Sequence, residues 1–350
     1  MSSSELNATM RVMMLKKGST HKSRRRTPWD KEEHRTPMQK FLYEHYSVRY
    51  DNHHPLLSET GETQLINSYV LKRCPHCSCE TIKMNGHTRN GVQRYKCMVC
   101  KQTFTPVTRT IFDGHKISLS EWIDYILNIC RYVSINADSW NNRNAFTTSR
   151  YWLEKLFLVL ESYQESIKLD EQVWFDETFY SVRSEDITRT DEGNKLRGLS
   201  SNQMCIGVAC DKTHTVCIFE GYGKPSQKKT YELFKEHIAV GSSLIHDEDN
   251  AHKKMVNELR LNSVAYDSRK IKLLKDKDNP LNRVNRIHYL LKSFLYAHTS
   301  FNRDKIQGYL NLFMFVMNPP TDHLEKVELL MDLAFQNPKT LRYRDFFAAK

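Results

Sequence analysis

The chain has 350 residues and a formal net charge of +11, with 52 Lys and Arg against 41 Asp and Glu. A chain of this length buries a sizeable core and is expected to form two or three domains. No apolar run approaches the roughly 18 residues of a membrane span, and the first residues lack the apolar core of a signal peptide. We therefore expect no membrane contact. The basic balance favours a polyanionic partner, of which nucleic acid is the commonest.

The nine cysteines are unevenly distributed. One group is dense: Cys74, Cys77, Cys79, Cys97 and Cys100. The others are scattered among apolar neighbours: Cys130, Cys205, Cys210 and Cys217. A secreted disulfide framework spreads its cysteines differently, so this pattern predicts an intracellular, cytoplasmic protein with one metal site and small core cysteines.

Residues 1–69 are polar and poorly periodic, and Lys16 to Arg26 carry six basic residues without an acid. Two interpretations of this basic arm stay open: a solvated, partly disordered segment, or a segment that contacts phosphates. Residues 40–50 are rich in aromatic side chains and predict a short docked helix.

Residues 70–110 contain two CxxC knuckles. Cys74 and Cys77 form the first, Cys97 and Cys100 form the second, and nineteen residues separate them. Each knuckle offers two thiolates from one tight turn, and a tetrahedral structural zinc ion needs both pairs. The intervening residues predict two hairpin strands, 81–87 and 93–96, so we expect a zinc ribbon in which Cys79 is not a ligand. A redox CxxC is the alternative, which the pairing of two knuckles disfavours.

Residues 116–168 have a helical period. The first helix is expected to begin at Ser118 or Ser120, the second covers 134–143, and Thr147 or Thr148 is expected to cap the third. Three short helices after a zinc ribbon predict a helix-turn-helix-like DNA-binding unit, although other small helical bundles give the same pattern. The candidate DNA contacts outside the core are Arg94 in the ribbon and Arg150 in the third helix.

Residues 170–318 predict an α/β core. Strand-like alternation is found at 172–182, 203–211, 215–222, 243–247 and 263–266. Helical patterns are found at 228–238, 252–261, 283–296 and 303–317, and 270–282 is expected to be a loop. This order predicts a ribonuclease H-like fold, a mixed five-stranded sheet with flanking helices. Residues 319–350 are assigned to a C-terminal tail.

Two of these strands carry a carboxylate. Asp176 lies within the strand 172–182, and Asp247 follows the apolar pair Leu244 and Ile245, 71 residues later. A single acid at a strand end is ordinarily a solvated cap. Two carboxylates brought together from separate strands instead suit an oxygen-ligated divalent ion such as Mg²⁺ or Mn²⁺.

A third candidate comes from the helix that starts near residue 283. Asn285, His288 and Lys292 are spaced i, i+3 and i+7, so they share one face of that helix. The apolar residues of the helix occupy another face and are expected in the core: Ile287, Leu290, Leu291 and Phe294.

With these motifs, residues 70 to about 318 resemble the insertion-sequence transposases of the ISXO-like group, which have an N-terminal zinc ribbon and a DDE-type core. The resemblance rests on the paired CxxC knuckles, the WFDET and LIHDEDNAH segments, and the helices LNRVNRIHYLLKSFL and FNRDKIQGYLNLFMFVMN. It implies that Asp176, Asp247 and a third residue hold two Mg²⁺ ions, and that Lys292 contacts the DNA end. It also implies a synaptic complex of at least a homodimer.

The chain departs from the usual pattern because Asn285, rather than Glu, occupies the third position. An Asn offers a carbonyl oxygen to a metal but carries no charge and cannot act as a base, so weaker metal affinity is expected. The acids considered as substitutes were Glu258, Asp276 and Asp278. The first lies on an intervening helix and the other two lie in a loop, so Asn285 remains the expected ligand.

The expected activity is polynucleotidyl transfer, in which the protein binds the terminal inverted repeats of its element, cleaves the 3′ ends and joins them to target DNA. Two metal ions roughly 3.5–4 Å apart would serve this reaction. Asp176 would contact both, and His288 would either touch a phosphate or pack as a neutral side chain. Two alternatives stay open: a catalytically inactive, domesticated DNA-binding regulator, and a ribonuclease H-like nuclease without joining activity.

Overall fold

The computed structural model describes residues 59–114, 119–141, 144–298 and 302–348. These residues form two compact units, one with 135–150 and one with 59–134 and 151–348. The basic arm and the predicted helix at 40–50 lie outside the described residues, as does the predicted cap Ser118. None of the helices in the described ranges has the length and apolar character needed to cross a membrane.

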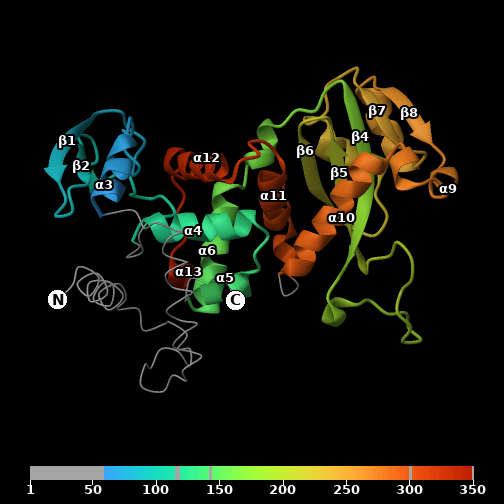
Figure 1. Ribbon diagram of the computed structural model, residues 1–350, viewed down its shortest axis with the longest axis horizontal. Coiled ribbons are helices and arrows are strands. Elements are labelled where there is room, and N and C mark those ends of the chain that lie inside the picture. Colours follow the sequence, from blue (N-terminus) through green and yellow to red (C-terminus); the bar gives the residue numbers. More distant parts are fainter. Residues whose placement is uncertain (1–58, 115–118, 142–143, 299–301, 349–350) are drawn as a thin grey trace, which may run out of the picture. The chain divides into compact units, whose positions relative to one another are not determined.

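Around the cysteines, three short strands form one small sheet in the order β1-β2-β3. The predicted hairpin is confirmed as β1 (Ile82–His87) and β2 (Gln93–Cys97), and β3 (Thr103–Phe104) extends it. The sequence analysis did not anticipate helix α3 (Glu59–Ser68), which lies beside this sheet (Figure 1). Thr63 of α3 donates a hydrogen bond to the turn carbonyl of Asn90 at 2.9 Å, so the helix is fastened to the hairpin turn.

The three predicted short helices are present as α4 (Leu119–Cys130), α5 (Ile135–Asn141) and α6 (Phe146–Val159). The prediction that Thr147 or Thr148 caps α6 is wrong. The backbone N–H groups of Thr148 and Ser149 both bond to the carbonyl of Ala145, so the first turn starts earlier. Within the first unit, the hydroxyl of Ser149 donates to the buried carboxylate of Asp138 at 2.8 Å.

The core is a mixed five-stranded sheet in the order β6-β5-β4-β7-β8. Its strands are β4 (Gln172–Ser181), β5 (Gln203–Cys210), β6 (Thr215–Tyr222), β7 (Ser243–Asp247) and β8 (Asn262–Tyr266). Strands β4, β5 and β6 pair antiparallel, whereas β7 pairs parallel with β4 and with β8. This is the ribonuclease H-like arrangement expected from the order of the elements.

Helices pack on both faces of this sheet. On one face, α7 (Gln227–Phe234) and α8 (Lys253–Glu258) bury Phe234 and Met255 against Phe175 of β4. Successive side chains of a strand point to opposite faces, so Trp174 lies on the other face. There its indole N–H donates to the carbonyl of Pro280 at 3.1 Å, just before α10 (Asn282–Ala297), which crosses the sheet in Figure 1. Helix α11 (Ile306–Met317) packs against β6.

Residues 319–350, assigned to a tail from the sequence, contain helices α12 (His323–Gln336) and α13 (Tyr343–Ala348). Helix α12 packs against α4. The ammonium group of its buried Lys326 donates to the carbonyl of Phe315 at 2.8 Å and to that of Asn318 at 2.5 Å. A cation at these carbonyls satisfies the C-terminal end of α11.

Within the described residues, the remaining short elements are one helical turn and five 3₁₀ segments. They are α9 (Ser268–Ile271), Tyr163–Ser166, Ser184–Asp186, Asn250–His252, Asp276–Asp278 and Arg303–Lys305.

Candidate active site and cysteine cluster

The two predicted carboxylates lie on the central pair of parallel strands. Strand β4 pairs with β7 through Gln172↔Ser243, Val173↔Leu244 and Trp174↔Ile245. Continuing the same offset of 71 residues, Asp176 of β4 lies level with Asp247 of β7. The structure therefore brings these two side chains to neighbouring positions at the carboxyl end of β7.

Electrostatics confirm that the two groups are near each other. Burial, together with the charges of Asp247 and Glu177, raises the pKa of Asp176 to about 7. One oxygen of each aspartate is held by the backbone: Asp176 accepts from the N–H of Glu177 at 2.9 Å, and Asp247 accepts from the N–H of Asp249 at 3.0 Å. A cation between the carboxylates would relieve their repulsion, so the pair fits a divalent metal.

Helix α10, which carries the third predicted group, packs against β4 and β5. The ring of His288 has a hydrogen-bonding contact with the backbone of Asp176, and its Nε2 atom has no other partner. Burial, aided by the charge of Lys292, lowers the pKa of His288 to about 4. His288 is thus a neutral, packed side chain. Asn285 lies one turn before it and Lys292 one turn after it, both half-buried.

Behind the carboxylates, on the α7 and α8 face, lies a buried polar chain that sequence reasoning missed. The Nε2 atom of His252 lies 3.2 Å from both carboxylate oxygens of Glu177. Its Nδ1 atom lies 2.9 Å from Nδ1 of His246 and 3.6 Å from Oδ1 of Asp247. The Nε2 atom of His246 lies 2.9 Å from the hydroxyl of Ser263. The side chain of His252 is fully buried.

The pKa shifts of the two histidines have opposite directions, which favours a proton on His252 rather than on His246. Burial opposes a charge on His252, but the hydrogen bond and charge of Glu177 outweigh it and raise its pKa. Burial and the charge of His252 lower the pKa of His246 to about 4. A His252 ring protonated on both nitrogens would donate from Nε2 to Glu177 and from Nδ1 to His246, and His246 would then donate from Nε2 to Ser263.

A second buried acid, Glu220 of β6, lies near Glu177. Its Oε2 atom accepts from the hydroxyl of Thr230 at 2.6 Å, and its Oε1 atom has no hydrogen-bond partner. Burial and the charge of Glu177 together raise the pKa of Glu220 to about 7, although the hydrogen bond from Thr230 opposes the rise. Gly207, which pairs with Glu177 across β4 and β5, makes room for it, because a Cβ there would lie 2.3 Å from Oε1 of Glu220.

The four cysteines of the two knuckles form one cluster. Their sulfur atoms all lie within 4.8 Å of one another, with 3.6 Å between Cys74 and Cys100 and 3.6 Å between Cys77 and Cys97. A disulfide would need about 2.05 Å, whereas sulfurs around tetrahedral zinc lie about 3.8 Å apart. Burial raises the pKa of the Cys97 thiol, but hydrogen bonds from the backbone N–H groups of Cys100 and Val99 outweigh this effect and lower that pKa to about 6. The cluster therefore fits zinc.

The remaining predicted residues are placed as follows. Cys79 stays outside the cluster, and its sulfur accepts from the N–H of Thr81 at 3.2 Å. Arg94 is half-buried on β2 of the ribbon, and Arg150 is half-buried in α6.

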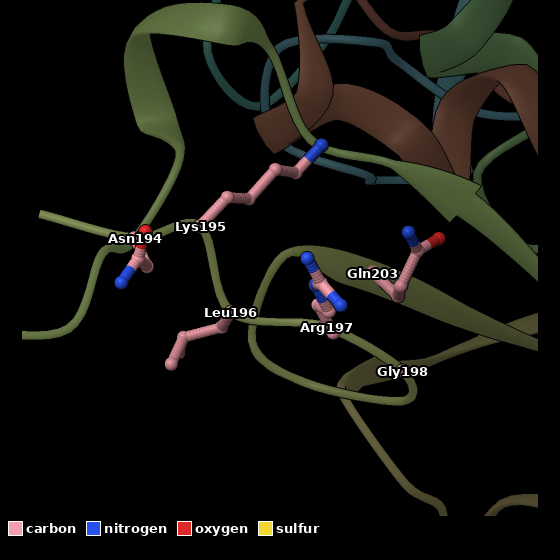
Figure 2. Close-up of a pocket in the computed structure, with 6 residues that line it drawn as sticks. All are labelled: Asn194, Lys195, Leu196, Arg197, Gly198 and Gln203. Carbon is pink, nitrogen blue, oxygen red and sulfur yellow. The ribbon is translucent and has the colours of Figure 1, made fainter.

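A cavity of about 390 Å³ lies in the connection between β4 and β5 (Figure 2). It is lined by Asn194, Lys195, Leu196, Arg197, Gly198 and Gln203. Gln203 pairs with Ser181 at the far end of β4, five residues beyond Asp176. Two of the lining side chains, Lys195 and Arg197, are basic, and none of the predicted site residues lines the cavity.

No protein-family model and no curated protein matches the chain. Among solved structures, the Mos1 mariner paired end complex with Mn has a TM-score of 0.27 and 9% identity, covering 94% of this chain and 84% of that one. The Drosophila P element transposase strand transfer complex has a TM-score of 0.27 and 10% identity, and the alignment covers 67% of this chain and 64% of that one.

An intasome of simian T-cell lymphotropic virus, in complex with the PP2A regulatory subunit B56 gamma, has a TM-score of 0.27 and 11% identity. The alignment covers 55% of this chain and 65% of that one, so the chain spans less than two thirds of its length. At these scores the likenesses add nothing to the fold assignment, which rests on the strand order and pairing of this chain.

Proposed function

We propose that the chain is a DNA transposase that cleaves and joins the ends of its own insertion sequence in a metal-dependent reaction. One observation carries this proposal: Asp176 and Asp247 lie level with each other on the central parallel strands of a ribonuclease H-like sheet. Helix α10, which carries Asn285, is held against the strand of Asp176 by the contact of His288 with the backbone of Asp176. The sequence resemblance to ISXO-like transposases assigns the same three positions.

The residues present fit a pair of divalent ions. In Asp176 and in Asp247, one carboxylate oxygen accepts from a backbone N–H and the other does not, so the second oxygen can bind a metal ion. Asn285 would add an amide oxygen. When bound, Mg²⁺ or Mn²⁺ would activate the attacking oxygen and stabilise the leaving oxygen. The aspartates would hold the ions, and the neutral His288 would keep the helix in place without taking a proton.

Helix α10 also supports DNA as the substrate. Among residues 282–297 it has three basic side chains, Arg283, Arg286 and Lys292, and no acid. Tyr289 on its outer side is 71% exposed. Lys292, two turns beyond Asn285, would hold a backbone phosphate in line with the carboxylates, because the phosphates dominate the binding energy of such complexes.

The parts before residue 170 would recognise the element's ends. We assign 70–110 to the zinc ribbon and 116–168 to the helical DNA-binding unit, with Arg94 and Arg150 as phosphate contacts. The core would then comprise 170–318. Synapsis of two ends would require a homodimer or a larger assembly.

The test is strand joining in vitro with labelled duplexes copied from the element's ends, in Mg²⁺ and in Mn²⁺. Wild type should yield joined product, Asp247→Ala should yield none, and Asn285→Ala should lose most of it. Binding of the ends without cleavage or joining would instead indicate a domesticated regulator. Cleaved ends that are never joined would indicate a nuclease.

A further inference from the structure

Backbone pairing between β4 and β7 stops before the two carboxylates. The last pair is Trp174↔Ile245, two residues short of Asp176 and Asp247. On the outer sides the ladders continue: β4 pairs with β5 through Ser181, and β7 pairs with β8 through Asp247↔Tyr266. At the level of the carboxylates, the distance between the two central strands is therefore not set by their own hydrogen-bond ladder.

A side chain spans this unpaired section. Glu177 follows Asp176 and His246 precedes Asp247, and alternation along each strand directs both toward the α7 and α8 face. His252 binds both of them, at 3.2 Å to Glu177 and at 2.9 Å to His246. Its ring also packs edge-on against Phe175, with 4.9 Å between the centroids.

Both ends of this link are themselves fixed. His246 bonds to Ser263 of β8 at 2.9 Å, and Glu177 belongs to β4, whose pairing with β5 is unbroken. His252 lies in the 3₁₀ turn Asn250–His252. Asp249 caps this turn, and its carboxylate accepts from the N–H of Ala251 at 2.8 Å. The same Asp249 donates its backbone N–H to Asp247 at 3.0 Å. The turn thus holds Asp247 through the backbone and β4 through His252.

We propose that His252 is a positioning residue that sets the spacing of Asp176 and Asp247, by linking Glu177 to His246 on the opposite face of the sheet. This inference rests on the proposed function, because it assigns a purpose to the spacing of two metal ligands. Groups that orient metal ligands typically change metal affinity by about 10–100-fold when they are removed.

The main rival is a metal ion held by His246, Asp247 and His252 themselves, whose ligand atoms lie within 4.8 Å of one another. The distances favour the link. Nitrogens bound to one tetrahedral zinc ion would lie about 3.3 Å apart, whereas the two Nδ1 atoms lie 2.9 Å apart, an ordinary hydrogen-bond length.

The test uses the full-length, zinc-loaded protein without DNA and titrates it with Mn²⁺ in a calorimeter. His252→Gln removes the link while keeping a polar side chain, and Glu177→Gln removes the charged partner while keeping the shape. His237→Gln is the matched control, because His237 is a buried histidine that packs on Phe234 in the same core and bonds to the carbonyl of Ile167. Asp176→Ala identifies the signal that belongs to the site.

His252→Gln should weaken Mn²⁺ binding at the Asp176-dependent site by about 10-fold or more. Glu177→Gln should weaken it less, and the double variant should be no weaker than His252→Gln alone, because both changes break one link. His237→Gln should bind as wild type. Affinity for the element's ends and the zinc content, one ion per chain, should be unchanged in all of them.

Two results would overturn the link and leave the proposed function standing. One is Mn²⁺ binding by His252→Gln and Glu177→Gln that equals wild type. The other is a second zinc ion in wild type that His252→Gln loses, which would establish the rival metal site. Wild type without any Asp176-dependent Mn²⁺ binding would refute the proposed function itself.

Discussion

The ring of His288 has a hydrogen-bonding contact with the backbone of Asp176, which joins helix α10 to the strand that carries the first carboxylate. The relationship explains why a buried histidine sits between Asn285 and Lys292 on one face of the helix. Because Asn285 lies one helical turn before His288, the contact also limits how far Asn285 can slide along the strand of Asp176. The neutral His288 does this without adding a charge to the site.

Replacing His288 with Phe should therefore impair strand joining more than it impairs folding. The change removes the contact with the backbone of Asp176, at a cost of about 1–3 kcal/mol, and lets the helix shift. His298→Phe is the control, because His298 is the buried residue that caps the C-terminal end of this helix and bonds to the carbonyl of Phe294 at 2.9 Å. Similar melting temperatures with activity lost only in His288→Phe would agree with this role, and equal loss of activity in both would contradict it.

The charge at position 285 should control metal affinity. Asn285→Asp adds a carboxylate at the proposed third ligand position, so Mn²⁺ should bind more tightly than in wild type, while Asn285→Ala should bind it more weakly. Calorimetric titration with Mn²⁺ measures both. Unchanged affinity in the two variants would show that Asn285 is not a ligand.

Glu220→Gln should stabilise the protein at high pH. The pKa of Glu220 is about 7 in the folded chain, against about 4.3 in an unfolded one. Between these values the folded state holds a proton that the unfolded state releases, so this contribution to stability is present at low pH and is lost as the pH rises toward 7. Gln does not titrate and retains a partner for Thr230.

The gain in stability of Glu220→Gln over wild type should thus grow from pH 5.5 to pH 8, by an amount on the order of 2 kcal/mol. Melting temperatures of the two proteins at both pH values give this difference. A gain that is the same at both would show that Glu220 is ionised throughout.

Zinc should depend on the four knuckle cysteines and not on Cys79. Cys77→Ser should lose the ion and unfold the ribbon, since zinc binding supplies about 10–16 kcal/mol in such small units. Cys79→Ser should keep one zinc ion per chain, because its sulfur lies outside the cluster. Metal content by mass spectrometry compares the two, and retention of zinc by Cys77→Ser would refute the site.

The sequence predicted the parts of the site that have a local signature. The paired CxxC knuckles, the strands around Asp176 and Asp247, and the shared face of Asn285, His288 and Lys292 all follow from spacing within one element. These strands and helices are confirmed, with ends that differ by a few residues.

What the sequence did not predict depends on contacts between distant segments. Glu177 and His252 meet only because two strands and a turn converge, and nothing in their local spacing indicates it. A second contact of this kind joins α12 to the segment before the ribbon: the hydroxyl of Tyr69 donates to Asp332 of α12 at 2.8 Å. The segment predicted to be a tail is therefore part of the packed structure.

The most direct test of the central claim is the yield of joined DNA from the element's own ends in Mg²⁺, comparing wild type with Asp176→Asn and Glu248→Gln. Glu248 is an exposed acid beside Asp247, so its variant controls for the loss of one nearby charge. We predict joined product with wild type and Glu248→Gln, and none with Asp176→Asn, which should still bind the ends. Joining that survives Asp176→Asn would contradict the account.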